Sequence, residues 1–222
     1  MSQNKQPWKT LSKKIIYDNP WIHVEEHDVI NPGGHAAIYG VVQFKNYALG
    51  VIPIDNEGNV YLIGQHRYPF NEYTWEIPEG GGNKNEDPLF NIKRELREEA
   101  GLIADTWTLL QEIHVSNSVS DEYGYIYLAQ NLTPCDPDPD DDEDLKILKI
   151  PFAEAYQMLE DGKIKDSLTV IALLKAKIVT RIVEINYIYS KINIWKITYS
   201  TRNKPSTAKL NTPDFGSALA QL

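Results

Sequence analysis

The segment Gly80–Leu102, GGGNKNEDPLFNIKRELREEAGL, decides the fold because a glycine run leads directly into a strongly patterned helix. Asp87 followed by Pro88 predicts the helix start, with Asp as the N-cap and Pro at the first helical position. Gly101 is the residue type that commonly follows a helix C-terminus. Four apolar residues recur at helical spacing, and they are Leu89, Ile92, Leu96 and Ala100. The sequence therefore predicts an amphipathic helix over residues 88–100, after a loop that the glycines open.

Three glutamates on this helix, Glu95, Glu98 and Glu99, stand at i, i+3 and i+4, so their carboxylates are expected on one exposed face. Neighbouring negative charges repel one another unless they are solvated or bind a cation. A ligand set of oxygens alone favours Mg²⁺ or Mn²⁺ over zinc. Arg94 can pair with Glu98 one turn later or with Glu86 in the preceding loop. Runs such as KRELREEA also occur on ordinary solvated helices, so the wider spacing has to decide.

The spacing around these glutamates is the specific signal. From Gly80 the chain reads five residues, Glu86, seven residues, Arg94-Glu95-Leu96, one residue, Glu98-Glu99, one residue and Gly101-Leu102. With nine fixed positions, agreement by chance is negligible compared with chance agreement with a loose motif. Each fixed position of the Nudix signature is matched, so the chain resembles the Nudix hydrolase family.

This resemblance implies a fold and a metal site. The fold is α/β, an α/β/α sandwich around a mixed sheet, with an N-terminal antiparallel β appendage. The implied metal ligands are the carboxylates of Glu95, Glu98 and Glu99 and the main-chain carbonyl of Glu79; Glu98 and Glu99 are also the implied catalytic residues. The residues implied to support the box structurally are Gly80, Glu86, Arg94 and Gly101. Bound Mg²⁺, or Mn²⁺ in its place, would neutralise a diphosphate, activate a water and stabilise the leaving phosphate.

Segments outside the box narrow the substrate class. GQHRYP before the box, WEIPEGG leading into it, IALLKA late in the chain and the strand-rich N-terminus resemble the ADP-ribose and nucleotide-sugar pyrophosphatase branch over residues 8–177. In that branch Arg67 and Glu76 would lie near the substrate, where Arg67 could grip phosphate bidentately. The branch also implies a general base, a glutamate in a flexible loop before the last strand. Glu143, within the acidic loop, matches that position best.

One segment departs from the pattern of this branch. ADP-ribose pyrophosphatases commonly carry a proline beyond the box where this chain reads HVSNSVSDE, with Asn117 near the expected place. ADP-ribose and hexose-linked nucleoside diphosphates, such as a GDP- or ADP-sugar, are therefore equal candidates. The implied substrate is a small-molecule nucleoside diphosphate derivative, and hydrolysis of its pyrophosphate bond would give a nucleoside monophosphate and a sugar phosphate.

Strand patterns and turns indicate the domain organisation. WIHVEEHDVI and AIYGVVQF flank the segment NPGG at residues 31–34, whose Pro and Gly are typical turn residues. The expected domains are an N-terminal β-hairpin region over residues 1–44, a Nudix domain over 45–177 and a C-terminal extension of unknown role over 178–222. The strand-rich ends and the resemblance together predict a homodimer that the N-terminal region forms.

The composition limits which partners and which cellular compartment are expected. The 222 residues are 42% hydrophobic and 24% charged, which is typical of a soluble globular protein. The formal net charge is -9, and Asp136–Asp144 supplies seven acidic residues without a base. No basic tract suggests a nucleic-acid partner, and no apolar run reaches the length of a membrane span. The single Cys135 cannot form an internal disulfide, so the cytoplasm is the expected compartment.

Three other functions compete with this hydrolase. An isomerase of isoprenoid diphosphates would need a catalytic cysteine, and Cys135 lies outside the expected site. A nucleotide sensor without turnover would have lost box glutamates, all of which are present here. A hydrolase of nucleoside triphosphates usually manages with a smaller domain. The sensor and a hydrolase of nucleoside triphosphates or dinucleoside polyphosphates stay as alternatives.

Overall fold

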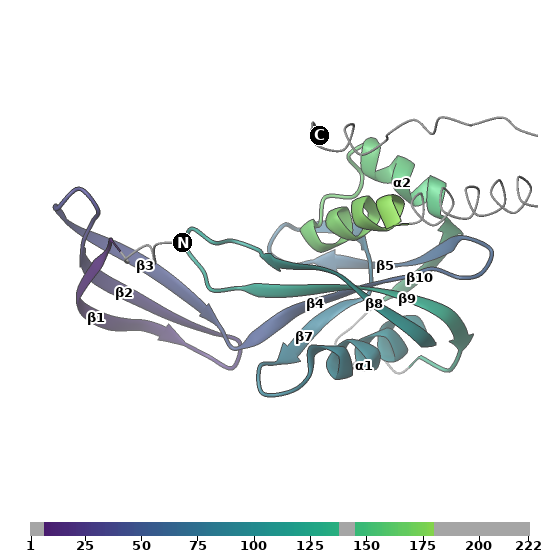
Figure 1. Ribbon diagram of the computed structural model, residues 1–222, viewed down its shortest axis with the longest axis horizontal. Helices are drawn as coiled ribbons and strands as arrows, with labels where there is room; N and C mark the ends of the chain where they lie inside the picture. The colour runs from purple at the N-terminus through teal and green to yellow at the C-terminus, as the bar shows by residue number, and fades with distance from the viewer. Residues whose placement is uncertain (1–6, 138–144, 180–222) are drawn as a thin grey trace, which may run out of the picture. The chain divides into compact units, whose positions relative to one another are not determined.

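The computed structural model describes residues 7–137 and 145–179, which form strands and helices in mixed order (Figure 1). In chain order the elements are β1 (Lys9–Asp18), β2 (Ile22–Ile30), β3 (Ala36–Phe44), β4 (Asn46–Pro53), β5 (Asn59–Arg67), β6 (Glu72–Glu76), β7 (Glu79–Asn83), α1 (Pro88–Ala100), β8 (Leu102–His114), β9 (Tyr123–Pro134), β10 (Lys146–Pro151) and α2 (Phe152–Glu160). A further helix covers residues 167–179.

The central sheet is mixed and has helices on both faces. Its strand order is β7-β4-β9-β8, in which β4 and β9 run parallel and the other neighbours run antiparallel. A second sheet has the order β10-β5-β6. Figure 1 shows α1 on one side of these strands, and α2 with the helix over residues 167–179 on the other. The predicted fold class, an α/β/α sandwich around a mixed sheet, is confirmed by this arrangement.

Helix α1 begins and ends where the sequence predicts. The Asp87 carboxylate accepts a hydrogen bond from the Leu89 N–H at 2.9 Å, and Pro88 occupies the first turn. Gly101 takes the left-handed conformation, with φ of 60°, which favours glycine after a helix C-terminus. Ile92 and Leu96 are fully buried in one core cluster with apolar residues of β4 and β9. Burial of this stripe holds the glutamate-bearing helix against the sheet.

The glycine run does not open a loop, so that expectation is wrong. Gly80, Gly81 and Gly82 belong to β7, which pairs antiparallel with β4. Glycine normally weakens a strand, but here it marks close approach of neighbouring side chains. A Cβ on Gly82 would overlap the Leu49 side chain, and one on Gly80 would overlap the Glu95 carboxylate. Tertiary packing therefore selects these glycines, and the loop starts only after Asn83.

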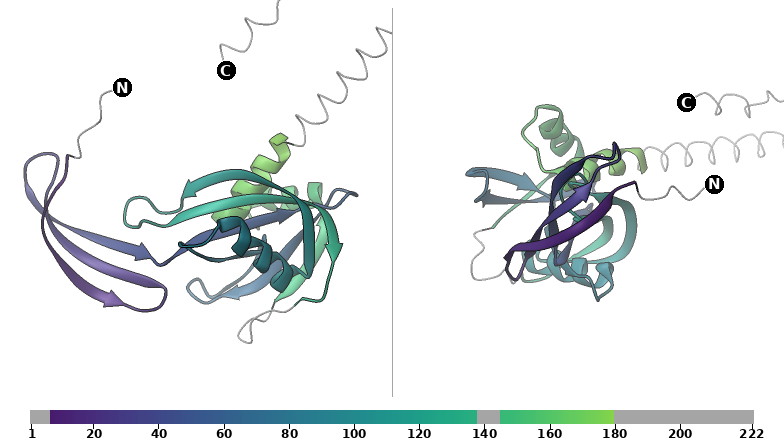
Figure 2. Two further views of the ribbon diagram at one scale, coloured as in Figure 1. Left: turned by 60° about the horizontal axis from the view of Figure 1, so that its bottom comes forward. Right: turned by 90° about the vertical axis from the view of Figure 1, so that its left-hand side faces the viewer.

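The N-terminal appendage is an antiparallel sheet in the order β1-β2-β3. The turn between β2 and β3 closes with a 2.9 Å hydrogen bond from the Gly34 N–H to the Asn31 carbonyl. Figure 2 shows these strands as a sheet of their own, with no described helix on either face. All ten residues of β1 are exposed, and Val29 is the one buried residue among the three strands. This sheet thus lacks a covering layer in the described part of the chain.

Some expectations fall outside the described residues. Glu143 and most of the acidic loop lie within residues 138–144, and nearly all of the C-terminal extension lies within 180–222. The domain division at residues 44 and 177 stays a prediction. Among the described residues, no helix is long and apolar enough to cross a membrane.

Candidate active site

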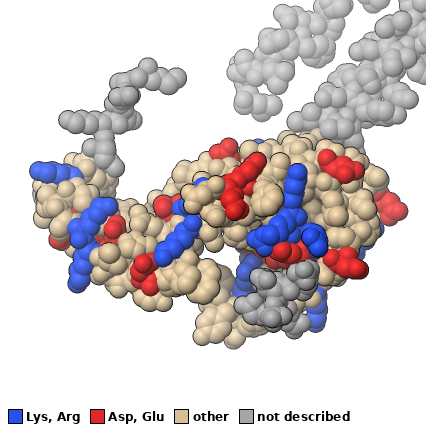
Figure 3. Space-filling view, turned by 90° about the horizontal axis from the view of Figure 1, so that it is seen from below, with Lys and Arg blue, Asp and Glu red and all other residues tan. Residues whose placement is uncertain are grey.

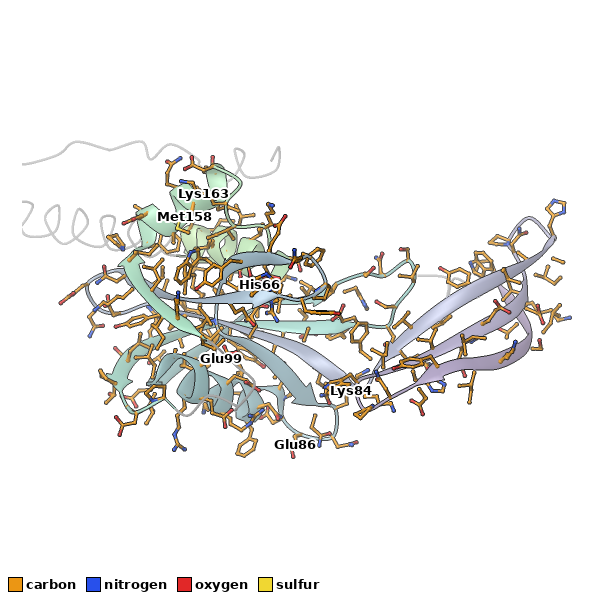
Figure 4. All side chains as sticks on the ribbon, turned by 180° about the vertical axis from the view of Figure 1, so that it is seen from behind. His66, Lys84, Glu86, Glu99, Met158 and Lys163 are labelled. Atoms are coloured by element: carbon orange, nitrogen blue, oxygen red, sulfur yellow. The ribbon has the colours of Figure 1, made fainter. Side chains whose placement is uncertain are left out.

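Glu99 lies where helix α1 meets the sheet (Figure 4). It is 5% exposed, so the expectation that Glu95, Glu98 and Glu99 share an exposed helix face is wrong for this residue. The Glu99 Oε2 accepts a hydrogen bond from the main-chain N–H of Glu79 at 3.0 Å. The amide of β7 thus holds the carboxylate of α1 in place, because a buried charge needs such partners.

Arg94 brings the other two box glutamates together. Its guanidinium donates to Glu98 and to Glu95, each at 2.5 Å, so it chooses Glu98 rather than the loop residue Glu86. The Glu95 side chain is 12% exposed and that of Glu98 is 27% exposed. Among the described residues, no three acidic, histidine or cysteine side chains stand in a metal-binding arrangement. A cation would therefore compete with Arg94 for these carboxylates.

The donor chemistry of this region nevertheless fits a hard divalent cation. The candidate ligands are all oxygens, as Mg²⁺ and Mn²⁺ prefer. The Glu95 carboxylate packs directly against Gly80, in space that any β-carbon at that position would fill. Gly80 therefore lets a carboxylate of α1 reach the backbone of β7. This is a structural reason for glycine at the first position of the box.

The pairing of β7 with β4 leaves the main-chain N–H and C=O of Glu79 without a hydrogen bond to β4. Glu79 stands opposite Gly50 of β4, and the adjacent hydrogen bond runs from the Val51 N–H to the Pro78 carbonyl at 3.0 Å. In an antiparallel pair this pattern makes Gly50 and Glu79 a non-hydrogen-bonded pair, whose N–H and C=O groups point away from each other. Because β7 is an edge strand, both groups of Glu79 face outward. The N–H reaches Glu99, and the C=O is available to a ligand.

Arg67 and Glu76, the expected substrate-binding residues, pair with each other across β5 and β6. Arg67 donates to Glu76 from Nε at 3.0 Å and from Nη2 at 2.5 Å. Thr74 also donates to the Glu76 carboxylate, at 2.8 Å, which satisfies a side chain that is almost fully buried. Burial alone would lower the pKa of Arg67, but the hydrogen bond and charge of Glu76 outweigh it and raise that pKa.

The Glu79 side chain lies near the same arginine. Its Oε2 is 4.0 Å from the Arg67 Nη2, and its Oε1 accepts a hydrogen bond from the Thr169 hydroxyl at 3.1 Å. Burial and the neighbouring Asp166 carboxylate raise the pKa of Glu79 well above its usual value, against the opposing charge of Arg67. The side chains of Glu79 and Asp166 therefore form a second acidic pair beside the box, outside the signature.

A pocket of about 500 Å³ lies beside the box, and Glu95, Glu98 and Glu99 are not among its lining residues. The expected site residues Arg67, Glu79 and Gly80 line it, while Trp21 and Phe44 of the N-terminal region line it from another side. Asp166, directly before the helix over residues 167–179, also lines it. Trp21 and Phe44 are not predicted from the sequence, because they stand in segments whose patterns are typical of ordinary strands. Asp166 could be recognised from the sequence, because it stands three residues before Thr169 at the start of a helical segment, where Asp is a typical N-cap residue.

The loop between β8 and β9 ties the N-terminal sheet to the box. Asp121 accepts a hydrogen bond from the Phe44 N–H at 2.8 Å, and its carboxylate lies 3.6 Å from the Lys84 Nζ. The Val42 N–H donates to the Val119 carbonyl at 2.8 Å. Figure 4 shows Lys84 and Glu86 in the loop that follows β7. Asn117 therefore belongs to a loop that helps to place one wall of the pocket.

Charges of opposite sign lie side by side on the face that Figure 3 shows, as seen from below the view of Figure 1. Ion pairs are also the rule around the box, where Arg94 has two glutamate partners and Arg67 has one close partner. An incoming cation would therefore have to displace Arg94 from Glu95 and Glu98.

Comparison with known proteins places this geometry in a family. Residues 8–42 match the nucleoside diphosphate sugar hydrolase N-terminal domain, and residues 45–171 match the NUDIX domain. An ADP-ribose pyrophosphatase of Bacillus subtilis is 28% identical over 74% of this chain and 90% of its own. A GDP-mannose pyrophosphatase of Yersinia enterocolitica is 32% identical over 71% of this chain and 87% of its own.

A solved structure shares the fold. The crystal structure of an ADP compounds hydrolase superposes with a TM-score of 0.72 at 23% identity, covering 81% of this chain and 97% of that one. The NUDIX match spans more than half of the chain and contains the complete box. The chain therefore belongs to the Nudix family, as a pyrophosphohydrolase with the N-terminal domain of nucleoside diphosphate sugar hydrolases.

Proposed function

We propose that this protein hydrolyses the pyrophosphate bond of a nucleoside diphosphate linked to a sugar, with Mg²⁺ or Mn²⁺ as its cofactor. The observation that carries the proposal is the shared pocket, because Arg67, Glu79 and Gly80 face the same cavity as Trp21 and Phe44. A volume of about 500 Å³ is typical of a small-molecule site. One side therefore suits phosphate and metal, and the other suits an apolar ring.

ADP-ribose and a hexose-linked nucleotide both stay candidates within this class. The similar proteins include an ADP-ribose pyrophosphatase and a GDP-mannose pyrophosphatase, at comparable identity. Asn117, in place of the proline common in ADP-ribose pyrophosphatases, belongs to the loop that anchors β3 through Val119. That loop contacts β3 at one wall of the pocket, and its Asp121 also reaches Lys84 of the box. It is the place where the two substrate types would be distinguished.

The cofactor would be held by the carboxylates of Glu95, Glu98 and Glu99 and by the carbonyl of Glu79. When bound there, Mg²⁺ supplies charge neutralisation for the diphosphate and activation of a water. Arg67 binds a phosphate oxygen with the guanidinium N–H groups that Glu76 leaves free. Arg94 orients Glu95 and Glu98 before binding, through its two hydrogen bonds. Glu143 is proposed as general base from the resemblance alone, since it lies outside the described residues.

The N-terminal sheet is proposed to form a homodimer. Its exposed apolar side chains include Leu11 at 54%, Ile15 at 63% and Ile38 at 69% exposure. Large apolar groups of this number on a sheet without a covering layer favour burial against another molecule. A second copy of the chain would supply that cover.

The test is phosphatase-coupled phosphate release with Mg²⁺ over a panel of ADP-ribose, GDP-mannose, ADP-glucose, UDP-glucose, NADH, diadenosine polyphosphates and nucleoside triphosphates. Preferential cleavage of one diphosphate-linked sugar would support the proposal and name the substrate. Preference for triphosphates or dinucleoside polyphosphates would replace the substrate class. Tight binding of one compound without turnover would instead support a sensor.

A further inference from the structure

Thr169 is a fully buried polar residue in the first turn of the helix over residues 167–179, and both hydrogen bonds of its hydroxyl reach the segment that leads into the box. Its hydroxyl accepts from the Ile77 N–H at 3.0 Å and donates to the Glu79 Oε1 at 3.1 Å. Its exposed fraction is 0%. The two partners flank Pro78, in the short connection between β6 and β7. One hydroxyl thus clamps the segment that enters the box, from a helix about ninety residues away in sequence.

The position of Thr169 is itself fixed. The Asp166 carboxylate caps the helix by accepting from the Thr169 N–H at 2.7 Å, and the Asp166 carbonyl accepts from the Val170 N–H at 2.9 Å. Leu168 packs so closely on β4 that a Cβ added to Gly50 would lie 3.1 Å from its Cδ2. The start of this helix therefore cannot shift without breaking a cap and opening the packing against the central sheet.

The clamped segment carries the main-chain groups of the proposed metal site. Glu79 offers its N–H to Glu99 at 3.0 Å, and its carbonyl faces outward from the edge of the sheet. Gly80, the next residue, contacts the Glu95 carboxylate. A small displacement of residues 77–79 would therefore disturb the carbonyl and two carboxylates together. Pairing with β4 holds one side of this segment, and hydrogen bonds to Thr169 and Glu99 hold the other.

We propose that Thr169 is a positioning residue of the metal site, acting through its hydroxyl on the Ile77–Glu79 segment. This inference rests on the proposed function, because it assumes that the box binds a divalent cation. Outer hydrogen-bond partners of metal ligands typically change metal affinity by roughly 10- to 100-fold when they are removed. Loss of the Thr169 hydroxyl is expected to weaken metal binding within that range.

The decisive comparison is Thr169→Val against Thr169→Ser in the full chain. Valine keeps the shape and removes the hydroxyl, whereas serine keeps the hydroxyl and removes a methyl group. We expect Thr169→Val to raise the Kd for Mn²⁺, measured by electron paramagnetic resonance without substrate, by roughly tenfold or more. Its half-saturating Mg²⁺ concentration in the hydrolysis assay should rise in parallel, while KM for the sugar nucleotide at saturating Mg²⁺ changes little. Thr169→Ser should restore Mn²⁺ binding close to the parent value.

Ala172→Gly is the matched control for a purely structural effect. Ala172 is fully buried in the same helix, and glycine there weakens the helix without touching the clamp. It should lower the melting temperature and leave Mn²⁺ affinity unchanged. If Thr169→Val does not fold, Thr169→Ala replaces it in the same comparison. Unchanged Mn²⁺ affinity in the hydroxyl-free variant, or an equal loss in Ala172→Gly, overturns the inference.

The outcomes also separate this inference from the proposed function. A parent protein that neither binds Mn²⁺ nor releases phosphate from any compound of the panel would overturn the proposed function, and the inference with it. A parent that does both, beside an unaffected Thr169→Val, would overturn the positioning role alone.

Discussion

Gly80 and Glu95 show how closely single residues are matched within the box. A Cβ on Gly80 would overlap the Glu95 carboxylate, whereas one on Gly81 would meet only the flexible side chain of Asn46, at 3.1 Å. Glu99 is matched as closely, because its buried carboxylate has the Glu79 N–H as a partner. The positions of the proposed ligands Glu95 and Glu99 therefore depend on the space beside Gly80 and on the hydrogen bond from the Glu79 N–H.

Gly80→Ala should therefore impair the protein far more than Gly81→Ala. The added methyl group at position 80 must push the Glu95 carboxylate away from β7, so we expect Mn²⁺ affinity to fall by roughly 10- to 100-fold. Gly81→Ala is the control, since Asn46 can move aside. Binding of Mn²⁺ and turnover of the preferred sugar nucleotide would be compared for both variants. Equal losses would contradict the assignment of Glu95.

Glu99→Gln should remove turnover while the fold stays intact. Glutamine keeps an oxygen that can accept from the Glu79 N–H, but it lacks the charge that a metal ligand supplies. We expect kcat to fall by about 100-fold or more, because metal catalysis contributes several kcal/mol. Circular dichroism and thermal melting would verify the fold, and Glu154→Gln, an exposed change on α2, would serve as the control. Retained Mg²⁺-dependent activity would refute Glu99 as a ligand.

Strand β4 is the element on which the site is assembled. Its residues pair with β7 on one side and with β9 on the other, and its two faces contact α1 and the helix over residues 167–179. Gly50 leaves room for that second helix and for Ile77, whose Cδ1 would lie 2.9 Å from an added Cβ. The stability of the site therefore follows from that of the elements around β4.

Helix α1 depends on its N-cap, and Asp87→Ala tests this. The substitution removes the acceptor of the Leu89 N–H and should lower the free energy of unfolding by about 1 kcal/mol. Asp87→Asn preserves the cap and should cost little. Urea unfolding at neutral pH measures both variants. An equal loss in both would show that the charge of Asp87, rather than its hydrogen bond, stabilises the helix.

The turn between β4 and β5 should make stability depend on pH. Burial opposes the charge of Asp55, but Lys149 at 2.8 Å and the N–H groups of Asn59 and Glu57 outweigh it and lower the pKa of Asp55 to about 2. A folded-state pKa below the ordinary Asp value of 3.8 stabilises the protein above that pH, and the effect is lost as pH falls through about 2.

Asp55→Ala is therefore expected to lower the free energy of unfolding at pH 7 by about 1–2 kcal/mol, after allowance for solvent around the half-exposed Lys149. At pH 3 the difference due to ionisation should shrink to about half, since the unfolded carboxyl is then mostly protonated. Denaturant unfolding of parent and variant at both pH values measures it. A difference that grows toward acid would contradict the lowered pKa.

At the scale of the whole molecule, the N-terminal sheet both contacts the rest of the chain and exposes an apolar surface. Within the chain, Asp121 links Phe44 to the loop after β7 through the Phe44 N–H and Lys84. The exposed apolar residues of β1 and β3 are not covered by other described residues of the chain. The sheet thus contributes Trp21 and Phe44 to the pocket while offering a surface for assembly.

Light scattering coupled to size-exclusion chromatography should return twice the chain mass of 25.3 kDa. Ile38→Glu places a charge among the exposed apolar groups and should shift the particle toward the monomer. Lys9→Glu replaces a residue that is already polar, so it should not shift the particle. A parent particle of 25.3 kDa would count against the dimer.

The sequence by itself determined the family, the helix and the class of chemistry. Caps and apolar spacing act within a few residues, so Asp87, Gly101 and the stripe through Ile92 are sufficient to set the bounds of α1. The fixed offsets of the box likewise name its glutamates before any contact is known.

Only the tertiary structure decided how those residues are used. The glycine run is strand rather than loop because β4 pairs with it, and Glu99 is buried because α1 docks on β7. Thr169 reaches Glu79 from about ninety residues away. Such contacts depend on how distant elements pack and pair, and local sequence patterns carry no information about them.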